Sequence, residues 1–167
     1  MLITSLWYGC ASAPTTDDSA ERYKMLALLM PSRIEIVEPF TRVRSFGDTN
    51  QPDGIELLVQ AVNSLDNPGL MIAGAIRVEL YEYVAASGDQ KGKPLERWDV
   101  ELSTARHQKT YWNQLTQMYE FRLGINPTRI PRAERYVLVV TYDSPLGERL
   151  TDEFVLRYTA PAGPLGG

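Results

Sequence analysis

The sequence predicts an all-β protein, an antiparallel β-sandwich of seven or eight strands with a short N-terminal helical segment. Apolar and polar residues alternate with a period of two in several short segments between residues 32 and 158. Stretches rich in Gly, Pro, Asn and Asp separate these segments, and no helical segments alternate with them as parallel strands would require. With 167 residues, the chain is long enough for one domain with its own core.

Residues 1–31 lead into this domain in three segments. We interpret residues 1–9 as the remainder of a signal peptide and residues 10–20, which are small, polar and acidic, as a flexible tether. Residues 21–31 predict a short helical segment, capped by Asp18 or Ser19 and ended by Pro31. We expect this segment to pack on the edge of the domain, or else to remain loose and partly exposed.

The sandwich domain is expected over residues 32–158. Residues 136–142 are almost continuously apolar, which is typical of a strand covered on both faces. One or two helical turns are predicted within 104–113, a long polar loop over 87–94, and a disordered tail over 159–167. The predicted strand segments are 33–37, 40–46, 55–62, 75–83, 97–102, 119–123, 136–142 and 150–158.

The segment INPTRIPRAERYVLVV, residues 125–140, resembles the entry to strand F of an immunoglobulin or fibronectin type III sandwich. Such domains often carry a tyrosine whose hydroxyl pins the preceding corner, and the resemblance assigns this place to Tyr136. The paired cysteines of immunoglobulin domains are absent, and other seven- and eight-stranded sandwiches fit the same strand pattern.

The charge distribution argues against two classes of partner. The formal net charge is −4 and charges of both signs are scattered without a basic run, so we expect no nucleic-acid partner. No apolar run approaches the roughly 20 residues that a membrane-spanning helix needs. The single cysteine excludes an internal disulfide.

That cysteine, Cys10, follows the sequence LWYG, and LWYGC resembles the lipobox of bacterial lipoproteins. Gly9 is the small residue before the cysteine, although Trp7 stands where leucine is usual and residues 1–9 contain no lysine or arginine. The resemblance implies that Cys10 carries the lipid and that residues 1–9 are removed. It also implies that the protein is anchored to a membrane of the cell envelope, facing the periplasm or the surface.

The sequence contains no pattern typical of a catalytic centre, a metal site or a cofactor site. His107 is the only histidine, and neither HExxH nor GxSxG occurs, so we expect a solvated histidine. Residues 47–54 do not satisfy the spacing of a calcium loop and are predicted to form a turn. Acidic residues that could pair as in a glycosidase are predicted instead to form charge pairs with Arg77 and Arg97 on a solvated sheet face. These acidic residues are Glu79, Glu82, Asp99 and Glu101.

Four aromatic residues are the candidate ligand-binding residues: Tyr81, Tyr83, Tyr111 and Trp112. Exposed rings could stack on a glycan or contact an envelope protein. Alternatively, Trp112 folds back over the end of the sandwich, and the two β-strand tyrosines pack under the 87–94 loop. The leading hypothesis is therefore a non-catalytic, lipid-anchored envelope protein with a binding or scaffolding domain. A glycan-binding module with its rings in one row is the alternative, and an enzyme is the third.

Overall fold

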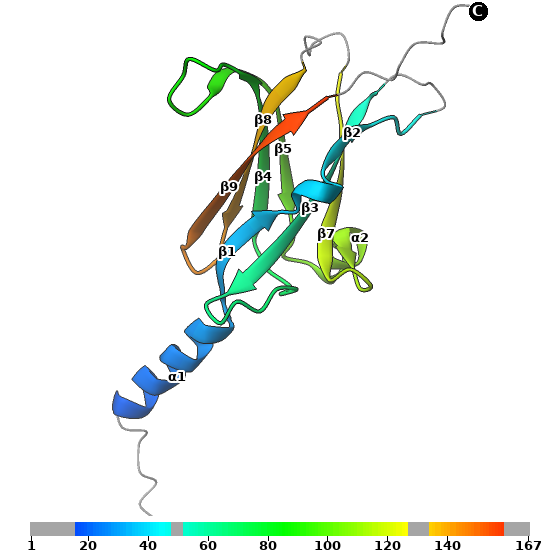
Figure 1. Ribbon diagram of the computed structural model, residues 1–167. Coiled ribbons are helices and arrows are strands. Elements are labelled where there is room, and N and C mark those ends of the chain that lie inside the picture. Colours follow the sequence, from blue (N-terminus) through cyan, green and yellow to red (C-terminus); the bar gives the residue numbers. More distant parts are fainter. Residues whose placement is uncertain (1–15, 48–51, 127–133, 159–167) are drawn as a thin grey trace, which may run out of the picture.

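A computed structural model describes residues 16–47, 52–126 and 134–158, and it shows two antiparallel sheets packed face to face (Figure 1). Cys10 and residues 159–167 lie outside the described residues. The first sheet has the order β1-β3-β7-β6, with β2 also paired to β3, and the second has the order β5-β4-β8-β9. The strands of the first sheet are β1 (Pro31–Ile36), β2 (Arg42–Arg44), β3 (Gly54–Asn63), β6 (Trp112–Asn113) and β7 (Met118–Gly124). Those of the second are β4 (Ala75–Tyr83), β5 (Lys91–Glu101), β8 (Arg135–Asp143) and β9 (Arg149–Arg157).

The strand order confirms the predicted immunoglobulin-like sandwich. In that fold, strands A, B, E and D form one sheet and strands C, F and G form the other, sometimes with an added strand beside C. Here β1, β3, β7 and β6 take the first four places, while β4, β8 and β9 take the other three and β5 is the added strand. The described residues form nine strands rather than seven or eight, and the strand that was not predicted is β6, a pairing of only two residues. Strand β2 covers three residues of the predicted segment 40–46.

The core lies between the sheets and follows the predicted alternation. In β3, Ile55, Leu57 and Val59 face inward and are almost fully buried. Burying a side chain of this size contributes about 1.5–3 kcal/mol. Strand β8 is buried on both faces, as its continuous apolar sequence predicted, since Val137 and Val139 are covered on the outer face as well.

Tyr136 is buried at the start of β8, the position that the immunoglobulin resemblance assigned to it. The corner that its hydroxyl would pin includes residues 127–133, which lie outside the described residues. The tyrosine corner therefore stays a prediction.

The N-terminal helix differs from the predicted one. Helix α1 spans Thr16–Leu29, so residues 16–20 are helical rather than part of a tether, and the helix ends two residues before Pro31. Helix α1 projects away from the sandwich (Figure 1), and residues 19–29 are all exposed. The loose, exposed alternative is therefore the correct one, and packing on the domain edge is wrong.

The loop between β4 and β5 is shorter than the predicted 87–94 loop. Strand β5 begins at Lys91, and a tight turn precedes it, in which Gln90 has a φ of 58° and accepts a hydrogen bond from the Val84 N–H. Two irregularities in the β4–β5 register, on either side of Tyr81, allow Pro94 to pair with that tyrosine. The polar composition of residues 91–94 therefore reflects an edge strand rather than a loop.

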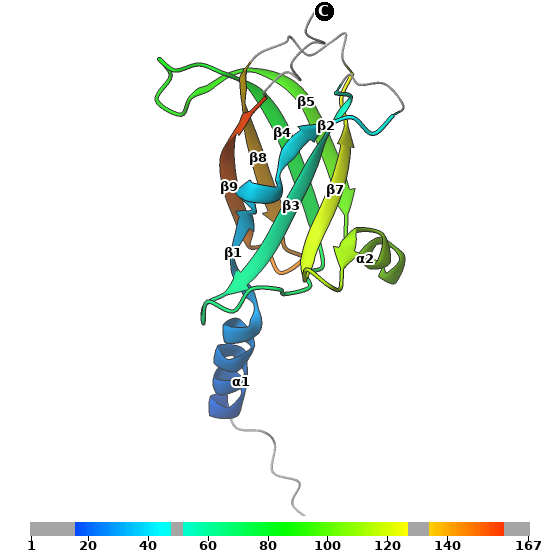
Figure 2. The ribbon, with the colours of Figure 1, turned by 45° about the vertical axis from the view of Figure 1, so that its right-hand side comes forward.

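The short helix predicted within 104–113 is confirmed as α2 (Ala105–Tyr111). The side chain of Thr104 caps it by accepting a hydrogen bond from the His107 N–H at 3.2 Å. A single-turn 3-10 helix, η1 (Glu38–Phe40), lies between β1 and β2 and contains Pro39. Figure 2 shows α2 beside β7, at the same end of the sandwich as α1.

Candidate binding site

Strand β7 has an open edge because its neighbour β6 is so short. On the side of β7 away from β3, only Trp112 and Asn113 pair with it, opposite Tyr119 and Met118. Immediately before Trp112 the chain turns into α2 and leaves the plane of the sheet. Within the described ranges, residues 120–124 of β7 therefore have a strand partner on the β3 side only.

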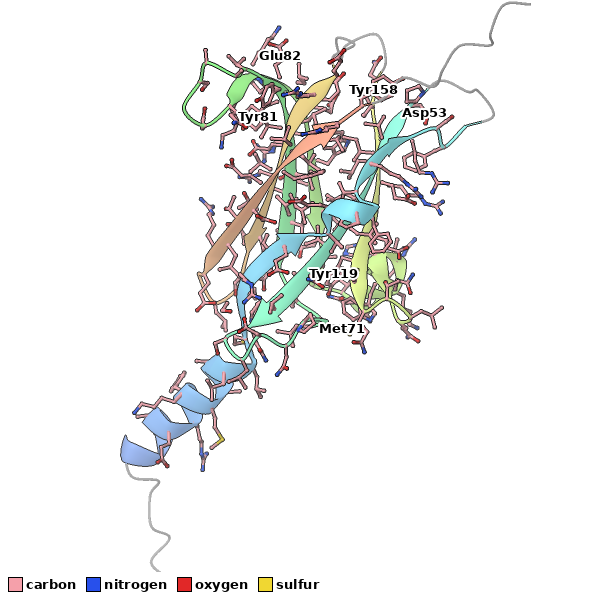
Figure 3. The ribbon with its side chains drawn as sticks, in the orientation of Figure 1. Asp53, Met71, Tyr81, Glu82, Tyr119 and Tyr158 are labelled. Carbon is pink, nitrogen blue, oxygen red and sulfur yellow. The ribbon has the colours of Figure 1, made fainter. Side chains whose placement is uncertain are left out.

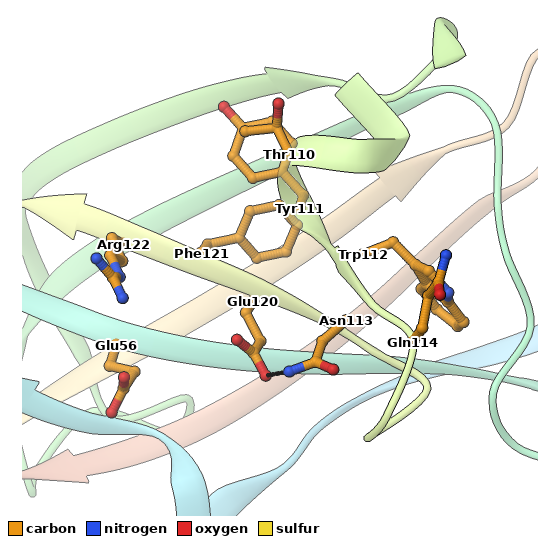
Figure 4. A pocket seen from close by; sticks show the side chains of 9 residues that line it. All are labelled: Glu56, Thr110, Tyr111, Trp112, Asn113, Gln114, Glu120, Phe121 and Arg122. Atoms are coloured by element: carbon orange, nitrogen blue, oxygen red, sulfur yellow. Dashed lines mark hydrogen bonds between the residues drawn. The ribbon is translucent and has the colours of Figure 1, made fainter. Parts of the chain in front are cut away.

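A hollow of about 540 Å³ lies along this open edge (Figure 4). Its lining comes from α2, from β6 and the residue after it, and from the neighbouring strands β3 and β7. The lining residues are Glu56, Thr110, Tyr111, Trp112, Asn113, Gln114, Glu120, Phe121 and Arg122.

Aromatic contacts with β7 fix one wall of the hollow. The ring of Tyr111 lies 5.3 Å from that of Phe121, centroid to centroid, and Trp112 meets Tyr119 edge-on at 4.9 Å. Such pairs add about 0.5–1.5 kcal/mol beyond the area that they bury. Both wall residues are thus half-buried and held in place rather than free to turn.

A buried polar network holds α2 in position behind this wall. The Gln108 side-chain amide donates hydrogen bonds to Ile72 O at 2.7 Å and to Leu102 O at 2.6 Å. Its Oε1 accepts a hydrogen bond from the Tyr119 hydroxyl at 2.7 Å, and that hydroxyl accepts one from the Ile72 N–H at 2.9 Å. Burial raises the pKa of Tyr119, so its hydroxyl stays protonated at neutral pH. The network joins the β3–β4 connection, the residue that follows β5, α2 and β7.

The charged groups of the hollow differ in how well they are paired. Glu56 interacts with the guanidinium groups of Arg42 and Arg44 at 3.1 and 2.9 Å. Glu120 accepts a hydrogen bond from Asn113 Nδ2 at 2.6 Å. Arg122 is exposed, and no hydrogen bond or ion pair joins its guanidinium to any described residue. The hollow therefore offers one unpaired cation beside aromatic rings and side-chain amides.

The four predicted aromatic residues do not form one site. Tyr111 and Trp112 lie together at the hollow, whereas Tyr81 and Tyr83 lie on β4 in the other sheet (Tyr81 is labelled in Figure 3). All four are half-buried. Burial raises the pKa of Tyr81, and the Arg135 guanidinium lies 5.4 Å from the centre of the Tyr83 ring. The single row of rings expected of a glycan module is absent, because the two pairs belong to different sheets.

Glu56, Glu120 and Arg122 line the hollow but were not candidate residues in the sequence. The alternation in YEFRL places Glu120 and Arg122 on the outer face of a strand, which by itself indicates only a solvated surface. They line a hollow because β6 begins only at Trp112 and does not extend along residues 120–124 of β7. No local pattern in the sequence indicates this. A second hollow, of about 720 Å³, lies between η1 and β9, and its lining includes Glu38, Phe154 and Arg157.

The acidic groups and the histidine are placed as follows. The Arg77 Nε lies 3.1 Å and the Arg97 Nε 2.9 Å from carboxylate oxygens of Asp99, which confirms the predicted charge pairing for Asp99. Glu101 instead accepts a hydrogen bond from the Ser103 N–H. Asp53 accepts hydrogen bonds from the backbone N–H groups that follow β2, and residues 48–51 of the predicted turn lie outside the described residues. His107 is half-buried on α2, and its Nδ1 is shielded from solvent without a hydrogen-bond partner, so the histidine is only partly solvated. Among the described residues, no three His, Cys, Asp or Glu side chains gather as metal ligands would.

No protein-family model, no curated protein and no solved structure matches this chain. In the part of the chain that the structure describes, no helix is both long and apolar enough to cross a bilayer.

Proposed function

We propose that this protein is a non-catalytic binding module of the bacterial cell envelope, anchored by a lipid on Cys10, which binds its ligand in the hollow beside β7. The observation that carries the binding proposal is the composition of this hollow. It combines two fixed aromatic side chains, Tyr111 and Trp112, with side-chain amides and the unpaired guanidinium of Arg122. Ligand sites are typically concave, with apolar walls and a few polar groups that orient the ligand.

The distribution of exposed apolar residues supports the anchor. Helix α1 exposes five large apolar or aromatic side chains, and four more lie in the connections β3–β4, β6–β7 and β8–β9, at the same end of the molecule (Figure 1). Exposed apolar groups gathered in one region are typical of contact with a membrane or a partner. The nine residues are Tyr23, Met25, Leu26, Leu28, Leu29, Leu65, Met71, Leu115 and Leu146.

The length of chain between Cys10 and Thr16 agrees with this arrangement. Six residue steps span at most about 20 Å. A lipid on Cys10 would therefore keep α1 within reach of the bilayer surface, with the apolar end of the sandwich turned toward it. The chain leaves β9 at the opposite end, which would then point away from the membrane (Figure 1).

A glycan ligand is the second candidate. Aromatic side chains beside amide and carboxylate groups are suited to sugars, because a ring contacts the apolar face of the sugar while polar groups bind its hydroxyls. The hollow has this combination in Trp112, Asn113 and Gln114.

Detergent phase separation of the protein from its native host tests the anchor. We expect the wild-type protein in the detergent phase and Cys10→Ser in the aqueous phase or unprocessed, because a diacylated cysteine binds membranes firmly. Mass spectrometry of the mature N-terminus is the decisive measurement. An unmodified Met1 would contradict the anchor.

Binding is tested with Arg122→Glu, which reverses the unpaired charge of the hollow. Lys93→Glu is the matched control, since it makes the same change of charge on an exposed residue of β5, in the other sheet. The three proteins are applied to a glycan array and to detergent extracts of host envelopes. We expect Arg122→Glu to lose a ligand that the control keeps, and equal binding by all three proteins would exclude the hollow.

A further inference from the structure

We propose that the open edge of β7 binds an extended peptide with an acidic side chain, which adds a strand to the sheet in the place that β6 leaves empty. This inference rests on the proposed binding function and specifies the class of its ligand. Addition of a strand to a free sheet edge is a common mode of peptide recognition, in which main-chain hydrogen bonds give affinity and side chains give specificity.

The backbone of β7 presents hydrogen-bonding groups to the hollow. In an antiparallel sheet, the N–H and C=O of one residue point to one side of the strand, and those of the next residue point to the other. Ile125 donates its N–H to Asp53 O at 2.7 Å, and the register from Gly124 to Tyr119 is regular. The backbone N–H and C=O groups of odd-numbered residues therefore point toward β3. Those of even-numbered residues point to the opposite side, where the hollow lies. Trp98 Nε1 donates to Gly124 O at 3.1 Å, which agrees with this direction.

The free groups are the C=O of Glu120 and the N–H and C=O of Arg122, because the pairing of Trp112 with Tyr119 places the Glu120 N–H opposite Tyr111 O. Within the described residues, β6 ends at the pairing of Trp112 with Tyr119, so no strand reaches these two residues from that side. At the other end of the free edge, the Trp98 side chain is hydrogen-bonded to Gly124 O. An added segment of about four or five residues, at about 3.3 Å per residue, fits between these two limits.

The other long edges of the sandwich are protected in ways that β7 is not. Strand β5 carries Pro94, and its register with β4 is irregular on both sides of Tyr81. Strand β9 packs against β1, where the Ile36 N–H donates to Asp152 Oδ2 at 2.7 Å. Irregularities, prolines and covering groups are the usual means of keeping further strands away from an edge. The edge of β7 instead adjoins a hollow.

Charge complementarity selects an acidic peptide as the occupant. Arg122 is the unpaired cation of the hollow, while Glu56 and Glu120 already have partners among the described residues. A second copy of the chain is a poor occupant, because antiparallel pairing of the two free edges along residues 120–124 would place Arg122 opposite its own symmetry mate. Like charges directly opposite one another destabilise a strand pair.

The probe is a hexapeptide of alternating threonine and valine with glutamate at its third position, titrated into the full-length protein. We expect saturable binding, and slowing of amide hydrogen exchange at Arg122 by about tenfold or more. The same peptide with lysine in place of glutamate should bind at least about tenfold more weakly. In Arg122→Glu the preference should reverse in favour of the lysine peptide, whereas Lys93→Glu should leave it unchanged.

Two N-methylated peptides test whether the peptide binds as a strand. One carries methyl groups on the odd-numbered amides and the other on the even-numbered amides. Only one edge of the peptide faces β7, so we expect one version to bind and the other to lose binding. Equal behaviour of the two versions, no reversal in Arg122→Glu, or no binding of either unmethylated peptide at millimolar concentration would overturn strand addition.

The failure of strand addition can be told apart from failure of the proposed function. If the peptides are inert but a glycan or an envelope ligand is lost in Arg122→Glu, the hollow is a binding site of another class, and only this inference is wrong. A concentration-dependent dimer in sedimentation that the glutamate peptide does not dissociate would assign the edge to a second copy and would overturn the inference as well.

Discussion

The two α-helices in the described part of the chain differ in length and in the number of contacts that hold them, and the longer helix has fewer such contacts. Helix α1 has 14 residues, yet all of its residues from 19 to 29 are exposed. Helix α2 has seven residues, but a threonine cap begins it, Gln108 ties it to two backbone carbonyls, and Tyr111 packs on Phe121. The comparison shows that tertiary contacts, rather than length, decide how firmly a helix is held here.

The difference has a physical basis and a functional consequence. A single helix of about 12–15 residues is only marginally stable in water, because the first turn is costly to form. Helix α1 therefore needs a further surface, which in our proposal is the membrane next to the lipid on Cys10. Helix α2 is fixed to the sandwich and can serve as the rigid wall of a binding site.

The largest effect is expected when the support of α2 is removed with Gln108→Ala. The substitution leaves Ile72 O, Leu102 O and the Tyr119 hydroxyl without their buried partner. We expect a loss of about 3 kcal/mol in the free energy of unfolding, measured by urea denaturation. The control is Gln114→Ala, at an exposed position, which should change it by less than about 0.5 kcal/mol. A loss as small as that of the control would show that α2 is held by its aromatic contacts alone.

A smaller effect, with a characteristic pH dependence, is expected for Tyr119→Phe. Removal of the hydroxyl should cost about 1–2 kcal/mol at neutral pH. Because burial raises the pKa of Tyr119 in the folded state, its contribution is fully present below the ordinary tyrosine pKa and is lost as the pH rises through the raised value. The alkaline fall in stability should therefore be shallower in the variant. The pKa of Tyr142 is also raised by burial, so part of the fall should remain. An unchanged alkaline profile would contradict the assignment.

Loss of the α2 cap in Thr104→Ala is expected to cost about 1 kcal/mol, because the His107 N–H loses its acceptor. Chemical denaturation measures this change. Thr104→Ser keeps a hydroxyl at the same place and should retain most of the stability. If both variants lost the same amount, the methyl group rather than the cap would explain the effect.

The smallest effect is expected in α1. Leu28→Ala should alter the free energy of unfolding of the sandwich by less than about 0.5 kcal/mol, since Leu28 is exposed and alanine favours a helix. Leu57→Ala in the core is the contrasting control, with an expected loss of about 2–5 kcal/mol. A loss above about 1 kcal/mol for Leu28→Ala would show that α1 packs against the sandwich.

Much of the fold could be predicted because strand alternation is a local property. The inward residues of β3 and β4 are spaced by two along the chain, and burial of one face of a sheet imposes that spacing directly on the sequence. The short helix before Trp112 was also predicted, but the Thr104 cap that begins it became evident only in the structure. The start of α1 and the length of the β4–β5 loop were wrong, since polar residues occur equally in tethers, in exposed helices and in edge strands.

By itself, the sequence determined the sandwich class and the core faces of the central strands, both of which depend on short-range patterns. Lipid attachment at Cys10 stays a proposal from the sequence. Only the tertiary structure decided that Tyr111 and Trp112 stand beside Arg122, while Tyr81 and Tyr83 belong to the other sheet. It also decided that β6 ends after two residues and leaves an edge of β7 open. These features depend on which strands become neighbours. Strand pairing joins residues that are far apart in the chain, and their side chains do not indicate with which residues they will pair.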